Sequence, residues 1–245
     1  MTTAPVFRVA REALAGPTVR LDGPEGRHAA LVRRLQPGER VDLTDGAGAL
    51  ARCTVRRADG AALDLDVVEL VDVPAPRPRI TVVQALAKGD RGETAVETMT
   101  EVGVDAIVPW TASRSVTQWH GERGARSLGR WRATAAEAAK QARRSWWPEV
   151  SEPHTTADAA KLLATAGLAI VLHESAEQPL ATLPDRAAGE IVLVVGPEGG
   201  ISPDELDRFA EAGAVGCRLG PTVLRTSTAG TVAAALLLAR VGRWS

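Results

Sequence analysis

The feature that most constrains the fold is a pair of glycine-rich turns, each of which follows a short apolar run and opens a helical pattern. The first turn occupies residues 196–202 (GPEGGIS), and the second occupies residues 219–230 (LGPTVLRTSTAG). A glycine turn at a strand end lets the backbone approach a ligand closely, because no Cβ stands in the way. Neither turn has the spacing of a P-loop or a dinucleotide fingerprint. Together they predict an α/β unit with a small-molecule pocket whose wall is mostly backbone.

From residue 80 onward, strand-like runs alternate with helix-like runs. We expect strands at residues 80–86, 106–110, 168–172, 191–195 and 214–219, and helices at residues 92–102, 128–144, 158–166 and 226–241. Ser202-Pro203-Asp204-Glu205 has every residue of a complete helix start, with Ser as N-cap and Glu closing a capping box. This alternation predicts a mostly parallel sheet with helices on both faces.

The first 73 residues have a different pattern, which is typical of a small β domain. Alternating strands are expected at residues 41–46, 51–57 and 63–70, with a short helical stretch at residues 26–35. Pro74, Pro76 and Pro78 then favour an extended connector, because proline continues neither a strand nor a helix. We therefore expect two domains, residues 1–73 and residues 74–245.

Composition excludes several classes of protein. No apolar run approaches the roughly 20 residues of a membrane span, and no signal peptide is visible, so we expect no membrane contact. Cys53 and Cys217 form no CxxC pair, and the four histidines have no metal-ligand spacing, so we expect neither a disulfide nor a metal. A reducing, cytoplasmic location fits this cysteine usage.

The charge distribution is uneven, although the net charge is only −1. Residues 114–144 hold eight Lys or Arg against two Asp or Glu, whereas residues 151–245 hold seven against eleven. A basic middle in a nearly neutral chain indicates a localised phosphate-binding face.

Three further groups have both a functional and a structural interpretation. His173-Glu174, at a strand end, can serve as acid–base groups or only bound the strand. Trp146 and Trp147 can stack on unpaired bases or pack in a core or dimer contact. Of the three consecutive hydroxyls that start at Thr226, one can N-cap the last helix, but three exceed what capping needs.

The ordered set of His173-Glu174, GPEGGIS and LGPTVLRTSTAG resembles the cofactor region of the SPOUT methyltransferases. Within that superfamily, the chain is most similar to the bacterial RsmE family of small-subunit (16S) ribosomal RNA uridine-N3 methyltransferases. The likeness extends to residues 28–39 (HAALVRRLQPGE), 100–104 (TEVGV) and 137–141 (EAAKQ), so it covers nearly the whole chain.

The resemblance implies a fold and a cofactor. The C-terminal domain would be a SPOUT α/β parallel sheet tied in a trefoil knot, preceded by a small PUA-like β-barrel that helps hold RNA. S-adenosyl-L-methionine would bind among the knot loops. The residues implied to bind it are Leu172, His173, Glu174, Gly196, Pro197, Gly199, Gly200, Ile201, Leu219, Gly220, Leu224 and Thr226.

The resemblance also implies a partner and a reaction. The chain would be a homodimer that acts on 16S ribosomal RNA within the assembled small subunit. From the chemistry of such a transfer, we assign the stabilisation of charge on the target uracil to Arg225, with Thr226 or Ser227 as hydrogen-bond partner, and Glu198 is the second acid–base candidate. Residues expected to hold RNA are Arg8, Arg33, Arg34, Lys88, Arg114, Gln141, Arg143 and Arg144.

The chain departs from the family pattern at two places. Ser227 stands where the usual LRTETA sequence has glutamate, so a general-base role for an acid there does not carry over. Near Met99, where a lysine is frequent in relatives, this chain has Glu97-Thr98-Met99. Two other functions stay open: a SPOUT ribose 2′-O or tRNA methyltransferase, and a non-catalytic RNA-binding factor for ribosome assembly.

Overall fold

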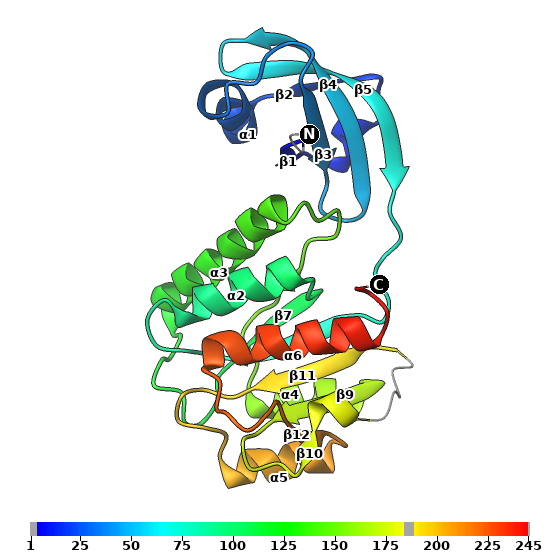
Figure 1. Cartoon of the computed structure of the whole chain (residues 1–245). Helices are drawn as coiled ribbons and strands as arrows, with labels where there is room; N and C mark the ends of the chain where they lie inside the picture. The colour runs from blue at the N-terminus through cyan, green and yellow to red at the C-terminus, as the bar shows by residue number, and fades with distance from the viewer. Residues whose placement is uncertain (1–3, 184–188, 245) are drawn as a thin grey trace. The chain divides into compact units, whose positions relative to one another are not determined.

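A computed structural model describes residues 4–183 and 189–244 (Figure 1). The chain divides into two compact units. The N-terminal unit comprises residues 1–75 together with residues 139–147, and the C-terminal unit comprises the remainder. The short segment 139–147 thus packs with a unit from which it is distant in sequence.

The N-terminal unit is a curled five-stranded sheet in the order β1-β3-β4-β5-β2. Strand β1 pairs with β3 in parallel, and the other pairs are antiparallel. The elements are β1 (Val6–Arg8), η1 (Arg11–Leu14), β2 (Thr18–Leu21), α1 (Gly23–Arg27), the π-helix η2 (His28–Val32), β3 (Arg40–Thr44), β4 (Ala49–Asp59) and β5 (Ala62–Asp72). Alternate residues of β3 and β4 point into a core of its own, which includes Phe7, Leu43 and Leu65.

The C-terminal unit contains a seven-stranded sheet in the order β10-β12-β9-β11-β6-β7-β8, with every pair parallel. Its strands are β6 (Ile80–Ala85), β7 (Ala106–Trp110), β8 (Glu149–Val150), β9 (Leu168–Leu172), β10 (Gln178–Pro179), β11 (Ile191–Val195) and β12 (Val215–Arg218). Strands β6, β7 and β11 are buried along their whole length, as expected for central parallel strands. The predicted parallel α/β sheet is confirmed.

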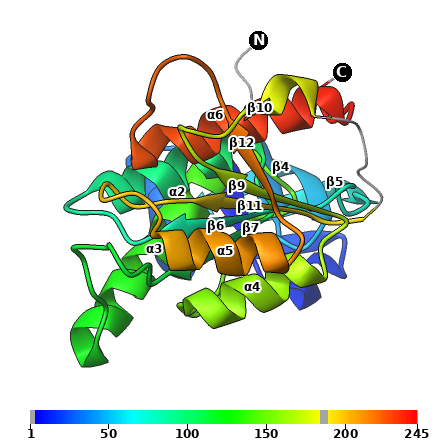
Figure 2. The same ribbon diagram turned by 90° about the horizontal axis from the view of Figure 1, so that it is seen from below.

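Helices cover both faces of this sheet, as Figure 2 shows. The helices are α2 (Arg91–Val102), α3 (Gly121–Gln141), α4 (Thr156–Ala164), α5 (Pro203–Glu211) and α6 (Thr226–Arg240), and η3 (Leu180–Thr182) is a 3-10 turn. Residues of α2, α3 and α6 share one core with the sheet, and residues of α4 and α5 share another. Parallel strands enclosed in this way leave their carboxyl ends as the natural place for a ligand.

Three local predictions need correction. Helix α3 begins at Gly121, seven residues before the predicted start, and α4 begins at Thr156 because Thr155, rather than a later residue, caps it. The last helix has Arg225 as N-cap residue, without a side-chain cap. Thr226 is therefore already helical, and its hydroxyl serves another purpose.

Candidate active site

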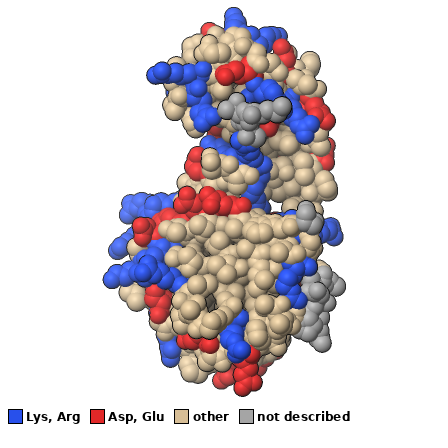
Figure 3. Space-filling model, in the orientation of Figure 1, with Lys and Arg blue, Asp and Glu red and all other residues tan. Residues whose placement is uncertain are grey.

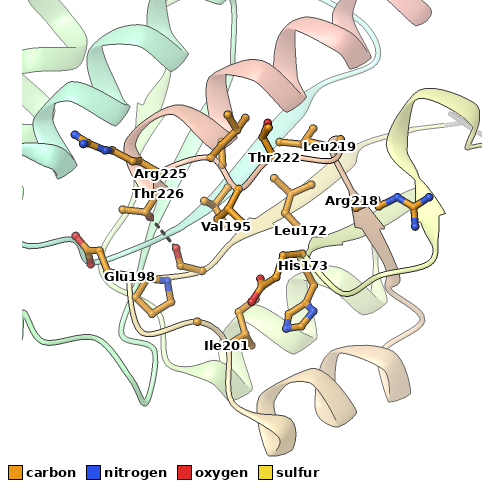
Figure 4. Close-up of a pocket in the computed structure, with 18 of the residues that line it drawn as sticks. Leu172, His173, Val195, Glu198, Ile201, Arg218, Leu219, Thr222, Arg225 and Thr226 are labelled. Atoms are coloured by element: carbon orange, nitrogen blue, oxygen red, sulfur yellow. Dashed lines mark hydrogen bonds between the residues drawn. The ribbon is translucent and has the colours of Figure 1, made fainter.

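A cavity of about 380 Å³ lies at the carboxyl ends of β9, β11 and β12 (Figure 4). These strands are neighbours in the sheet, so the three loops that follow them converge at one edge. The first loop contributes Leu172 to Glu174, the second Gly196 to Ile201, and the third Leu219 to Thr226. Of the predicted cofactor residues, all but Gly199 line this cavity, and Gly199 lies within the second loop. The two glycine-rich turns therefore meet around one cavity.

The backbone wall that the second loop forms depends on its glycines, as positions 199 and 200 show. A Cβ on Gly199 would lie 2.9 Å from the carbonyl oxygen of Arg114, closer than real Cβ contacts allow. Gly200 has φ +73°, in the left-handed region that favours glycine, and its N–H donates to the carbonyl of Pro197 at 2.9 Å. The loop therefore presents peptide groups to the cavity and packs its outer side against residue 114.

Glu205 anchors the start of the helix that follows this loop. Ser202 and Glu205 form the predicted capping box of α5, and Glu205 also accepts hydrogen bonds from the Ser113 N–H at 2.8 Å and from the Thr156 hydroxyl at 3.0 Å. Burial raises the pKa of Glu205, but the hydrogen bonds from Ser113 and Ser202 outweigh burial and hold the pKa below its usual 4.5. One carboxylate thus ties α5 to the loop after β7.

We expect Glu205→Gln to lower the free energy of unfolding at neutral pH by about 1.5–3 kcal/mol, because the hydrogen bonds lose their charged acceptor. The folded pKa is lowered, so the stabilisation is complete above pH 4.5 and is lost as the pH falls through the folded value. Urea unfolding from pH 7 to pH 3 measures this, with the exposed Glu211→Gln at the end of α5 as control. An equal difference from wild type at both ends of that range would contradict the assignment.

A buried hydrogen-bond relay fixes the start of α6 against the second loop. The Thr226 hydroxyl accepts from the Gln84 amide at 3.0 Å and donates to the Gly196 carbonyl at 2.7 Å. Gln84 is fully buried near the end of β6, and its Oε1 has no hydrogen-bond partner among the described residues. The relay links the ends of β6 and β11 to α6, and Gly196 lines the cavity.

Thr226→Val should cost about 1–3 kcal/mol of stability, because valine has the same shape but removes the donor to the Gly196 carbonyl and one of the two acceptors of the Gln84 amide, which keeps only the Ala85 carbonyl. Ligand affinity at the cavity should fall together with stability, because the Gly196 carbonyl in the cavity wall loses the hydrogen bond that fixes its position. Denaturant unfolding and calorimetry measure the two effects, and Thr226→Ser, which keeps the hydroxyl, is the matched control. Identical behaviour of the valine and serine variants would show that the relay is unimportant.

The charged candidates lie mainly on one side of the cavity. Arg225, Thr226 and Glu198 lie together there, opposite Leu172, His173 and Arg218 (Figure 4). Glu198 accepts from the Lys88 N–H at 3.2 Å and from the Arg91 guanidinium at 3.0 Å. Burial raises the pKa of Glu198, but hydrogen bonds from its own backbone N–H, from Arg91 and from the Lys88 N–H outweigh burial, so the pKa lies below the ordinary value. Glu198 is therefore ionised at neutral pH, and its carboxylate already accepts hydrogen bonds from Lys88 and Arg91.

Arg225 differs from Glu198 in how much its charged group is paired. It is exposed, and within residues 4–183 and 189–244 its guanidinium forms no hydrogen bond or ion pair. A planar guanidinium with free donors beside a cavity can bind an anionic or carbonyl oxygen of a ligand. His173 is less free, because its Nδ1 lies 2.8 Å from the Ser175 hydroxyl in a local turn. That contact favours the strand-bounding role for His173-Glu174.

The predicted RNA-binding residues divide between the two units. Lys88 and Arg114 belong to the C-terminal unit and are exposed. The N-terminal unit holds the other six: Arg8, Arg33, Arg34, Gln141, Arg143 and Arg144. Arg8 places its guanidinium 4.8 Å from the centre of the Trp147 ring, and the Trp146 indole donates to the Val73 carbonyl at 2.8 Å. Both tryptophans thus pack within the N-terminal unit, which favours the core interpretation over base stacking.

Several residues at the site were missed by sequence reasoning. Arg91, Arg218 and Thr222 line the cavity, and Gln84 holds Thr226. Gln84 had a detectable signal, because it is the one amide in the apolar run of residues 80–86. Arg91 had none, since its role depends on Glu198, which lies 107 positions away along the chain.

Neither a membrane-spanning helix nor a metal-ligand cluster occurs in the described part of the chain. None of the helices there is both long and apolar enough to cross a membrane. Among the described residues, no three His, Cys, Asp or Glu side chains are grouped as metal ligands would be.

Both units match known protein families. A family model described as an RNA methyltransferase domain matches residues 74–238, and one described as an RNA methyltransferase PUA domain matches residues 21–68. The seven-stranded sheet with its strand-end cavity, together with the curled N-terminal sheet, therefore defines an RNA methyltransferase.

The particular family follows from individual relatives. Ribosomal RNA small subunit methyltransferase E of Mycobacterium tuberculosis is 47% identical over 228 residues, which are 91% of this chain and 87% of the relative. The protein of the same name from Bacillus subtilis is 28% identical, with 87% and 86% covered. The chain belongs to this family, RsmE.

Solved structures agree. The putative methyltransferase Lpg2936 of Legionella pneumophila, in complex with the bound cofactor SAM, has a TM-score of 0.87 at 26% identity, with 98% of each chain covered. The small-subunit methyltransferase E of Neisseria gonorrhoeae, bound to S-adenosyl methionine, has a TM-score of 0.85 at 26% identity, with 97% of this chain and 98% of that chain covered.

Proposed function

We propose that this chain transfers the methyl group of S-adenosyl-L-methionine to N3 of a uridine in small-subunit (16S) ribosomal RNA. The observation that carries the proposal is the cavity of about 380 Å³ at the carboxyl ends of β9, β11 and β12. It is formed by the same turns on which the family resemblance rests, in a chain that belongs to the RsmE family.

The cavity suits the methyl donor. Its volume lies within the roughly 300–1,000 Å³ of ordinary small-molecule sites. Leu172, Ile201 and Leu219 offer apolar contacts to a purine base, while the glycine loops offer peptide groups to ribose and carboxylate. When bound, S-adenosyl-L-methionine supplies an electrophilic methyl group on a positively charged sulfur.

The protein must then hold the uracil and stabilise charge. Uridine N3 gives its weakly acidic proton to the ionised Glu198 carboxylate or to water, and the negative charge that remains spreads over the two flanking carbonyl oxygens. We assign the stabilisation of that charge to Arg225, whose guanidinium is exposed beside the cavity, with Thr226 fixing the helix start beneath it. Glu198 is the second candidate acid–base group, although its lowered pKa makes it a weak base.

RNA binding would use both units. We assign residues 1–73 as the PUA-like RNA-binding domain and residues 74–245 as the methyltransferase domain, of which residues 139–147 pack with the N-terminal unit. Arg33, Arg34 and Arg143 are exposed in the N-terminal unit and would contact phosphates, as would Lys88 and Arg114 in the C-terminal unit. Affinity for RNA should therefore fall steeply as the salt concentration rises, and an affinity that does not depend on salt would argue against these phosphate contacts.

The topology and the assembly are also part of the proposal. We propose that α6 is threaded as in a trefoil knot, which is supported by the hydrogen bonds that Arg240 donates to the carbonyls of Leu180 and Leu183 in the loop between β9 and β11. A homodimer is supported by two exposed apolar residues, Val223 just before α6 and Val232 within it. We place the reaction on the assembled small subunit, in the cytoplasm and without a metal.

Calorimetry with S-adenosyl-L-methionine tests the donor site first. One donor bound per chain is the expected result, and no binding would favour the non-catalytic assembly factor. Analysis of the methylated nucleoside then separates the enzymes, since a ribose 2′-O product or a tRNA product would identify a different SPOUT activity.

A further inference from the structure

A second cavity, of about 990 Å³, opens where α2 and α3 begin. It is lined by residues of the loop after β7, Val116 to His120, by the loop after β6, by the first turn of α2 and by the first three turns of α3. No residue of the methyl-donor cavity lines it, so the two cavities are separate. Resting on the proposed function, we propose that this second cavity binds a nucleotide of the substrate RNA that neighbours the target uridine.

The second cavity is connected to the donor cavity through shared elements. Arg91 lines the donor cavity, whereas Asp90 and Gly92 on either side of it line the second cavity. The loop after β7 also connects them: its Arg114 guanidinium donates at 3.5 Å to the Gly199 carbonyl, in the loop that forms one wall of the donor cavity. Its Thr117, which lines the second cavity, donates to the Ala87 carbonyl at 3.0 Å. A chain of RNA that places one base at the donor cavity therefore passes next to the second one.

Trp119 gives this cavity an aromatic wall. Its ring is half-buried and meets the fully buried Trp131 edge-on, with ring centres 5.0 Å apart. Trp131 in turn packs so closely on α2 that a Cβ on Gly92 would lie 2.8 Å from it. Trp119 is thus held by a rigid neighbour, while its indole N–H donates no hydrogen bond within the described residues. A fixed, partly open indole is a stacking platform for an unpaired base.

The charges of the cavity specify where a phosphate would lie. The Glu93 carboxylate is neutralised by the Arg130 guanidinium, which lies 2.9 Å away, and Asp90 lines the cavity directly before α2. Arg123, in the first turn of α3, is exposed and forms no ion pair or hydrogen bond among the described residues. Lys and Arg side chains gather over the left edge of the C-terminal unit in Figure 3, where α2 and α3 begin. The phosphate is therefore expected beside Arg123, with the base against Trp119 and its edge near the Gln118 amide.

The test measures binding and turnover separately. Trp119→Ala should weaken the binding of a short fluorescent oligouridylate, and raise KM for undermethylated small subunits, by about 5- to 150-fold. Arg123→Ala should weaken both and reduce the salt dependence of RNA binding by about one phosphate contact. Donor affinity by calorimetry and kcat at saturating subunits should stay at wild-type values. Trp119→Phe keeps an aromatic ring and should recover most of the affinity.

Controls separate this inference from a folding defect and from the proposed function. Arg208→Ala removes an exposed arginine from α5, on the opposite face of the sheet, and should change nothing. Loss of donor binding in Trp119→Ala would indicate that this variant is misfolded. In that case Arg123→Ala, which replaces an exposed side chain, tests the inference instead. Wild-type KM and RNA affinity in Arg123→Ala and in a folded Trp119 variant would overturn the inference. Absence of methylation by the wild-type protein would instead overturn the proposed function.

Discussion

Arg225→Ala is expected to lower kcat by about 100- to 1,000-fold, while affinity for S-adenosyl-L-methionine changes little. This is the usual cost of removing one donor that stabilises developing negative charge. The expectation rests on the position of Arg225, which lies beside Thr226 at the cavity with its guanidinium unpaired among the described residues. Single-turnover methylation at saturating donor, together with calorimetry, measures the two quantities.

The conservative variant Arg225→Lys sharpens this test. Lysine keeps the positive charge but loses the planar pair of donors, so kcat should lie between those of wild type and the alanine variant. A methylation rate in Arg225→Ala equal to that of wild type would remove Arg225 from the mechanism. Glu198 would then become the first candidate for the acid–base role.

Gly199→Ala is expected to weaken donor binding by about ten-fold or more. The new Cβ would lie 2.9 Å from the carbonyl oxygen of Arg114, and because that atom is backbone, the loop at 196–201 or the loop after β7 must move. The first of these loops forms one wall of the donor cavity, so its displacement reduces affinity, while kcat at saturating donor should change less.

Gly129→Ala is the matched control for this substitution. Gly129 lies within α3 and has an ordinary helical backbone, and a Cβ added there would meet no atom within 4 Å. Donor affinity in that variant should equal that of wild type. Equal affinity in Gly199→Ala would show that the packing of the loop against residue 114 does not shape the donor site.

The strands and caps of the C-terminal unit could be predicted from sequence because local signals determine them. The continuous apolar runs Leu168–Leu172 and Ile191–Val195 are strands with the predicted bounds, and Ser202 with Glu205 forms the predicted capping box. The start of α3 was missed because Gly121 and Gly124 have low helix propensity. In that first turn Gly124 is buried against Trp119, where a Cβ would lie 2.9 Å from a backbone carbon, and this tertiary contact is not visible in the local sequence.

The parts of the fold and of the site that sequence did not predict depend on contacts between residues that are distant in sequence. The segment 139–147 joins the N-terminal unit through Trp146 and Trp147, which cover Gly48 and Gly46, and no local pattern indicates this. The Thr226 hydroxyl was a candidate cap, but its true partners, Gln84 and Gly196, lie 142 and 30 positions away. Sequence therefore indicated the turns that line the cavity, whereas the hydrogen bonds that hold these turns required the fold.

Methyl transfer from labelled S-adenosyl-L-methionine to small ribosomal subunits that lack this modification tests the proposed activity directly. The labelled nucleoside is then identified by mass spectrometry and mapped in the RNA. We expect N3-methyluridine at a single position of the small-subunit RNA, formed on assembled subunits faster than on naked RNA. Label in another nucleoside, in ribose, or in no RNA at all would contradict the account.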